Sequence, residues 1–153
     1  MQFSSRFPIA IHILLAIAEF EGKEKTTSVF LAGSVNVNPV IIRNTLRQLK
    51  SAGLVTVKAG EGGAALAKEP KAITLTDVFD AVEKEEELFH FHENPNPQCP
   101  VGKNVHAVLD NRLFAIQDAM REKMSSITLQ DLIDDMNVLL QSPGLNCCVP
   151  LAP

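Results

Sequence analysis

The sequence predicts a mainly α-helical protein with one small β-hairpin, in which a helical N-terminal domain precedes a long C-terminal helix. Three observations support this class. Apolar residues recur at helical spacing before residue 52 and again after residue 104. Three clustered glycines between two short apolar runs indicate a hairpin turn. An apolar fraction of 46% over 153 residues is typical of a single domain with a buried core.

Two helices are expected before residue 36. The first covers residues 5–20, can be capped by a serine at position 4 or 5, and has an apolar face formed by Ile9, Leu14, Ile17 and Ala18. His12 lies within this apolar stretch and is interpreted as a half-buried packing residue. The second helix is short and is expected to begin at Thr27 or Ser28, either of which can cap it.

The third helix has two distinct faces. Asn38 can cap it, Pro39 suits its first position, and Gly53 suits the left-handed residue after its end near residue 52. One face is apolar and should pack on the core, with Ile42, Leu46 and Leu49. The next face is basic, with Arg43, Arg47 and Lys50. Two helices joined by a short polar turn form a helix-turn-helix pattern, although an ordinary amphipathic helix with a solvated basic face has the same spacing.

The glycine-rich stretch follows this pattern directly. Gly60, Gly62 and Gly63 separate "LVTVK" from "AALAK", and both runs are plausible short strands. A phosphate-binding loop would need a Lys-Ser/Thr pair and a following helix, and neither is present. Helix, helix-turn-helix and then a hairpin is the order of a winged helix-turn-helix domain.

Charge is distributed unevenly along the chain. The net charge is −4, yet residues 1–75 hold nine Lys/Arg and five Asp/Glu, whereas residues 76–153 hold five and thirteen. No acidic residue occurs between Lys25 and Gly60. This asymmetry favours a basic face for a polyanion such as DNA.

The segment "NPVIIRNTLRQLKSAGLVTVKAGEGGAALAKEPKAITLTDVFDAVE" closely resembles the Rrf-two family of bacterial transcription regulators, and the resemblance extends over roughly residues 3–140. It implies a winged-helix domain, a long dimerisation helix, and binding of near-palindromic double-stranded DNA as a homodimer. The expected DNA-binding residues are Thr27, Ser28, Asn38, Val40, Arg43, Asn44, Arg47, Lys50, Lys58, Gly60, Gly62 and Gly63.

The wing departs from the usual family pattern. The family commonly has an arginine before the glycines and an aromatic residue after them, where this chain has Lys58 and Ala64. Glu61 at the tip would be repelled by phosphate. We therefore expect the helix over residues 39–52 to read most of the DNA sequence of the operator, because arginine and asparagine suit guanine and adenine edges. The wing is expected mainly to contact phosphates.

Apolar residues repeat at spacings of 4-4-3 along the C-terminal half: Val105, Leu109, Leu113, Ile116, Met120, Met124 and Ile127. Such a stripe predicts pairing with a second copy, with packing on its own domain as the alternative. Thr128 and Asp131 are typical of a capped final helix. The expected organisation is a DNA-binding domain over 1–84, a sensor-type loop over 85–103, dimerisation and final helices over 104–141, and a flexible tail over 142–153.

Cysteine content bears on the cofactor. Cluster-binding members of the family carry three closely spaced cysteines before the dimerisation helix, whereas this loop has only Cys99. We therefore expect no iron–sulfur cluster and no other cofactor. Cys99 could be a redox-sensing thiol or a residue without a sensing role. A zinc or copper site is the third interpretation, from His90, His92, Cys99 and His106.

Several function classes are not expected. The sequence contains no catalytic motif such as H-E-x-x-H or G-x-S-x-G, so an enzyme is not predicted. The longest apolar run is too short to span a membrane, and a cytoplasmic protein without membrane contact is expected. A repressor is preferred to an activator. A winged-helix module that binds protein instead of DNA is the remaining alternative.

Overall fold

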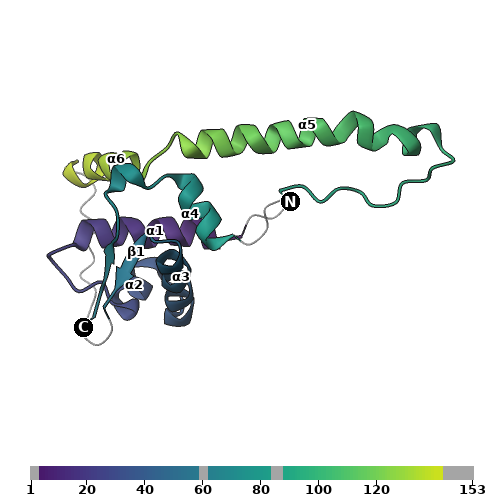
Figure 1. Ribbon diagram of the computed structural model, residues 1–153. Helices are drawn as coiled ribbons and strands as arrows, with labels where there is room; N and C mark the ends of the chain where they lie inside the picture. The colour runs from purple at the N-terminus through teal and green to yellow at the C-terminus, as the bar shows by residue number, and fades with distance from the viewer. Residues whose placement is uncertain (1–3, 59–61, 84–87, 143–153) are drawn as a thin grey trace.

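The computed structural model describes residues 4–58, 62–83 and 88–142. Figure 1 shows a winged-helix domain from which one long helix projects. The elements are α1 (Arg6–Phe20), α2 (Ser28–Val35), α3 (Pro39–Ser51), β1 (Val55–Val57), β2 (Ala64–Leu66), a 3₁₀ turn η1 (Pro70–Ala72), α4 (Leu75–Val82), α5 (Pro100–Ser125) and α6 (Leu129–Gln141). The predicted mainly α-helical class with one hairpin is confirmed. None of the helices within the described ranges has both the length and the apolar character that a membrane crossing requires.

The predicted capping residues are confirmed at α2 and α3, whereas at α1 the Ser4 hydroxyl, and not Ser5, accepts a hydrogen bond from the Arg6 N–H at 3.1 Å. The Thr27 hydroxyl accepts a hydrogen bond from the Phe30 N–H at 3.2 Å, which starts α2. The Asn38 side chain accepts one from the Val40 N–H at 2.9 Å, which starts α3. Gly53 has φ +73°, the left-handed conformation expected after the end of α3.

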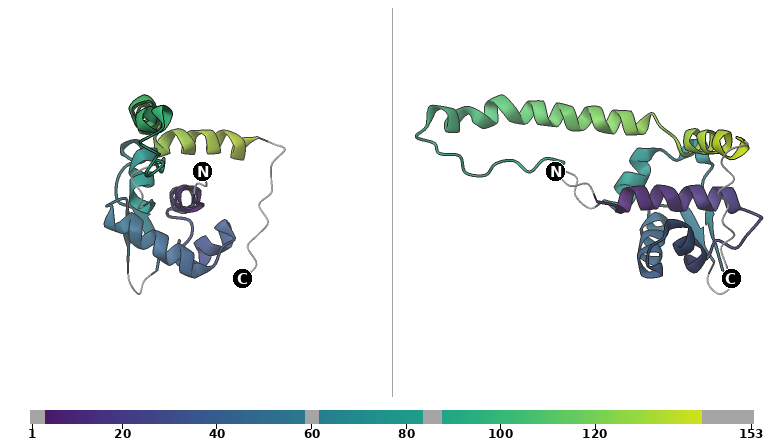
Figure 2. Two further views of the ribbon diagram at one scale, coloured as in Figure 1. Left: turned by 90° about the vertical axis from the view of Figure 1, so that its right-hand side faces the viewer. Right: turned by 180° about the vertical axis from the view of Figure 1, so that it is seen from behind.

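The hydrophobic core lies around α1. Figure 2 shows α2 and α3 on one side of this helix and α6 on the other. Ile13 and Leu14 are fully buried, as are Ile42 and Leu49 of α3, so the predicted core face of α3 is confirmed. His12 is a wrong prediction: it is exposed, and its Nε2 lies 3.0 Å from the Ser34 hydroxyl of α2. His12 lies outside the apolar face by which α1 packs on the core, and its side chain is therefore exposed.

The hairpin is short and antiparallel, with Val55 opposite Leu66 and Val57 opposite Ala64. Its three-residue strands are shorter than the two sequence runs suggested. Residues 59–61, which include Gly60 and Glu61, lie outside the described residues.

Helix α5 extends away from the domain, and none of its residues is buried. At a rise of about 1.5 Å per residue, its 26 residues extend over roughly 39 Å. It begins at Pro100, so the expected boundary at 104 was too late; proline suits the first helical position. The preceding loop runs beside it: the Leu88 N–H donates to Gln117 Oε1 at 3.0 Å, and the Phe91 and Phe114 rings are 5.0 Å apart.

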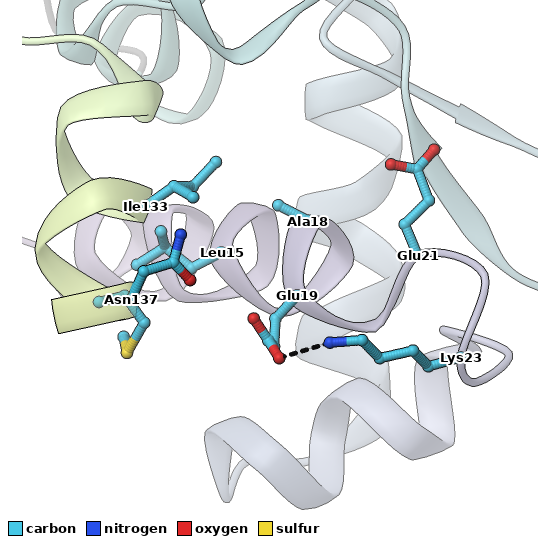
Figure 3. Close-up of a pocket in the computed structure, with 8 residues that line it drawn as sticks. Leu15, Ala18, Glu19, Glu21, Lys23, Ile133 and Asn137 are labelled. Carbon is cyan, nitrogen blue, oxygen red and sulfur yellow. Dashed lines mark hydrogen bonds and ion pairs between the residues drawn. The ribbon is translucent and has the colours of Figure 1, made fainter. Parts of the chain in front are cut away.

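Helix α6 brings the chain back to the domain. The Leu129 N–H donates to the Ile73 carbonyl at 2.8 Å, and the Leu75 N–H donates to the Ile127 carbonyl at 3.0 Å. Thr128 and Asp131 form the predicted capping box. Figure 3 shows Ile133 of α6 facing Leu15 of α1 beside a hollow between the two helices, next to the Glu19–Lys23 ion pair. The expected tail over 142–153 lies, apart from its first residue, outside the described residues.

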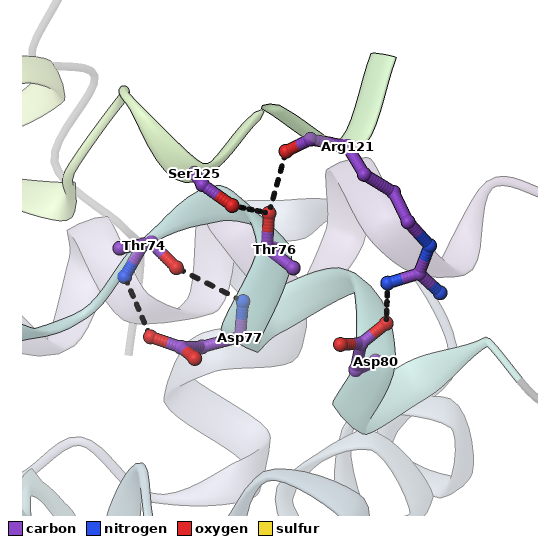
Figure 4. A network of polar contacts seen from close by, with 6 residues as sticks. All are labelled: Thr74, Thr76, Asp77, Asp80, Arg121 and Ser125. Atoms are coloured by element: carbon purple, nitrogen blue, oxygen red, sulfur yellow. Dashed lines mark hydrogen bonds and ion pairs between the residues drawn. The ribbon is translucent and has the colours of Figure 1, made fainter. Parts of the chain in front are cut away.

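A polar cluster joins the end of α5 to α4 (Figure 4). The Thr76 hydroxyl donates to the Arg121 carbonyl at 3.2 Å and lies 2.9 Å from the Ser125 hydroxyl. Arg121 also pairs with Asp80 at 3.0 Å. This cluster fixes where α5 leaves the domain.

Candidate nucleic-acid interface

A groove of about 520 Å³ opens between the start of α2, the exposed side of α3 and the hairpin. It brings together most of the residues expected to contact DNA: Thr27, Ser28, Arg43, Arg47, Lys50, Lys58, Gly62 and Gly63. These residues are spread over three elements of the sequence. The fold therefore places the predicted reading helix and the predicted wing on one surface.

The cations of α3 lie along this groove. Arg43, Arg47 and Lys50 are exposed, and α3 carries no acidic residue. None of the three forms an ion pair with another described residue. Their charges are therefore available to an anionic partner.

The hairpin is anchored to the start of α2 by a residue that the sequence did not single out. Thr26 is 4% exposed, and its hydroxyl donates to the Ala64 carbonyl at 2.6 Å. The Ala64 N–H donates in return to the Thr26 carbonyl at 3.1 Å. This reciprocal pair fixes the base of the wing beside α2. No local pattern reveals it, because the two residues are 38 positions apart.

The two described wing glycines have the conformations that only glycine adopts readily. Gly62 has φ +70° and Gly63 has φ +125°. A Cβ at Gly62 would lie 3.3 Å from Thr27 Cγ2. Glycine here therefore allows the hairpin to approach the capping residue of α2 closely.

The N-terminal half of α3 also has exposed residues outside the groove. Asn38, Val40 and Asn44 are exposed but do not line the groove. Asn38 already uses its side-chain oxygen to cap the helix. Val40 and Asn44 are one helical turn apart and so lie side by side.

The loop before α5 ends at Cys99, which occupies the capping position of α5. The N–H groups of Gly102, and secondarily of Val101, lower the pKa of its thiol. His106 pairs with Asp110 at 3.0 Å. Within the described ranges, no three His, Cys, Asp or Glu side chains gather where they would hold a metal ion. Cys99 is the one described cysteine; the pair at 147 and 148 lies outside the described residues.

Comparison with known proteins shows the family to which the chain is similar. The Rrf2 family model, described as "Iron-dependent Transcriptional regulator", matches residues 3–135. The "Putative HTH-type transcriptional regulator YwnA" of Bacillus subtilis is 45% identical over 133 residues, which cover 87% of this chain and 98% of the relative.

Two solved structures share the fold. One, called "a putative DNA binding protein", is 40% identical with a TM-score of 0.68 over 84% of this chain and 99% of its own. The other is CymR, the global cysteine regulator of B. subtilis, 26% identical with a TM-score of 0.64 over 88% and 97%. The relatives are named as regulators, which points away from an enzyme. The chain belongs to the Rrf2 (Rrf-two) family of transcriptional regulators.

Proposed function

We propose that this protein is a homodimeric repressor that binds near-palindromic DNA through α3 and the hairpin. The observation that carries the proposal is the groove that Arg43, Arg47 and Lys50 of α3 line together with Lys58 of the hairpin. A recognition helix enters the major groove with its N-terminal residues leading. In this arrangement the cations along α3, together with Lys58, contact the phosphates and base edges of the DNA major groove.

The dimer is proposed from the surface of α5. Two residues of the predicted stripe are exposed, Leu109 at 44% and Ile116 at 55%, and the other five are only half-buried. Aliphatic side chains left in water are stabilised by burial against another surface. A second copy supplies that surface and gives the two-fold symmetry that a near-palindromic site requires. The repressor role follows from occupancy, because a dimer seated on a promoter obstructs polymerase.

We further propose that the dimer works without an iron–sulfur cluster, although the family description names iron. Such clusters are held by several cysteine thiolates at close spacing. The loop before α5 offers Cys99 alone, and the other two cysteines follow about fifty positions later as an adjacent pair. This donor set does not fit a cluster.

Salt-dependent binding tests the proposal. The operator is first selected from random duplexes, and its dissociation constant is then measured over a range of salt. The affinity of the parent should fall steeply with salt, with a slope of about −0.9 per phosphate contacted. The Arg43→Ala/Arg47→Ala variant should bind more weakly, with a slope shallower by about two.

A matched control removes the same charge elsewhere. Lys103→Ala/Arg112→Ala alters two exposed cations of α5 and should leave both affinity and slope unchanged. Equal operator binding by the parent and the Arg43→Ala/Arg47→Ala variant would refute the reading face. A parent that binds a protein, but no duplex at any salt, would establish the alternative of a protein-binding module.

Cys99 supports a second candidate role, that of a thiol sensor. The neighbouring N–H groups lower its pKa and so favour the thiolate, and the side chain is partly exposed. Under this hypothesis, peroxide changes operator affinity in the parent but not in Cys99→Ser. If both respond equally, Cys99 is not the sensor.

A further inference from the structure

Two large aliphatic side chains are exposed in the first turn of α3. Val40 is 50% exposed and Ile41 is 42% exposed, whereas the following residue, Ile42, is fully buried. Other positions of α3, among them Ile42 and Leu49, supply the core, and these two side chains lie outside it. Two exposed aliphatic residues at the leading end of a basic helix are available to the partner that this helix binds.

The local structure holds both residues at this end. The Asn38 side chain accepts the Val40 N–H, and Pro39 occupies the first position, so the turn is fixed by its cap. The Ile41 carbonyl accepts a hydrogen bond from the buried Thr45 hydroxyl at 2.9 Å. The backbone that carries the two side chains is thus fixed, and they project from the leading end of the helix roughly 100° apart around its axis, as an apolar step.

We infer that Val40 and Ile41 read the C5-methyl groups of thymine in the operator. This inference rests on the proposed function and adds the base that the first turn selects. On the major-groove edge, the thymine methyl is the one apolar group, and every other feature there is a donor or an acceptor. Valine and isoleucine offer no hydrogen bond, so contact with another base would desolvate polar groups without compensation.

The surrounding charge favours DNA as the occupant of this apolar step. Arg43 lies one turn from Val40 on the same helix, and Arg47 and Lys50 continue the row. No acidic residue occurs between Lys25 and Gly60, so nothing in this segment repels phosphate. The step and the cations therefore suit the same partner, with phosphates on the cations and thymine methyls on the step.

Replacement of thymine by uracil tests the inference, because it removes only the methyl group. Each thymine of the selected operator is replaced singly by deoxyuridine, and the dissociation constant is measured at fixed salt. At least one thymine in each half-site should lose affinity by about fourfold for the parent, the value expected for one buried methyl group. The Val40→Ala/Ile41→Ala variant should lose this sensitivity.

A control valine separates base reading from general loss of apolar surface. Val138 of α6 is 68% exposed, and Figure 2 shows α6 on the side of α1 away from α3. Val138→Ala should keep the full uracil sensitivity. All the substituted residues are exposed and alanine is a good helix former, so the variants should fold.

The inference is overturned if no uracil substitution weakens binding of the parent, or if the sensitivity persists in Val40→Ala/Ile41→Ala. A parent that does not distinguish the thymine operator from the uracil operator overturns the inference even where the double variant binds both operators weakly. Salt-dependent operator binding in these experiments would leave the proposed function standing. Absence of binding to any duplex would instead refute the proposed function itself.

Discussion

The winged-helix domain and helix α5 differ in how much of their apolar surface is buried within the chain. In the domain, Ile13, Leu14 and Leu49 are completely removed from water. In α5, none of the residues is buried, and Val101 is 72% exposed. The domain is therefore stabilised by its own buried core. Helix α5 is instead held by its backbone hydrogen bonds, by the loop beside it and by the Thr76 cluster at its end. Under the proposed function, one chain therefore carries a complete reading surface, whereas α5 needs a second chain to cover it.

The largest expected effect contrasts a core leucine with an α5 leucine. Leu49→Ala should lower the free energy of unfolding by about 2–5 kcal/mol, because it leaves a cavity beneath α3. Leu109→Ala, at a site already 44% exposed, should change unfolding of the domain far less. Chemical denaturation measures both. Equal losses in the two variants would break the distinction between the regions.

A charge in the α5 stripe should act on assembly. Ile116→Asp places a carboxylate in the proposed dimer surface, and desolvation of that charge should convert dimers to monomers. Asn111→Asp adds the same charge on the opposite side of the helix and should leave the dimer intact. Sedimentation analysis reports the change, and a dimer that survives Ile116→Asp would contradict the proposed surface.

The cluster between the two regions should have a smaller effect. Thr76→Val removes the hydroxyl that bonds the Arg121 carbonyl, at a cost of about 1 kcal/mol. Thr56→Val, in the exposed face of β1, is the matched substitution without such a partner. Thermal unfolding compares the two. If both variants unfold at the temperature of the parent, the cluster does not hold α5 to α4.

The smallest effect concerns acid. The Thr128 N–H, and secondarily its hydroxyl, lower the pKa of Asp131. A lowered folded-state pKa means that this stabilisation is present above the unfolded pKa and is lost as pH falls through the folded one. Asp131→Asn should therefore be less stable than the parent at neutral pH and should converge with it in acid. Asp135→Asn, exposed on the same helix, is the control, and a deficit independent of pH would contradict the account.

The sequence was most informative where structure is local. Asn38 and Pro39 predicted the start of α3, and the spacing of Ile42 and Leu49 predicted its core face, because both depend on neighbours within a few residues. The hairpin turn at Gly62 and Gly63, both of which have positive φ, followed from the same kind of reasoning. The roles of the predicted DNA-binding and dimerisation residues remain predictions.

Long-range contacts were not visible in the sequence. Thr26 pairs with Ala64 through the three-dimensional arrangement, and no spacing rule connects them. The pairing of Thr74 with Thr128, which returns α6 to the domain, is of the same kind. His12 was misplaced because an apolar run does not reveal which of its positions faces water.

The stoichiometry of the operator complex shows whether a self-contained reading domain acts together with a helix that needs a partner chain. The mass of the complex is measured on one near-palindromic duplex with the full chain in excess. We predict two chains per duplex, with each reading surface on one half-site. One chain per duplex would contradict the account, because α5 would then remain uncovered on bound DNA.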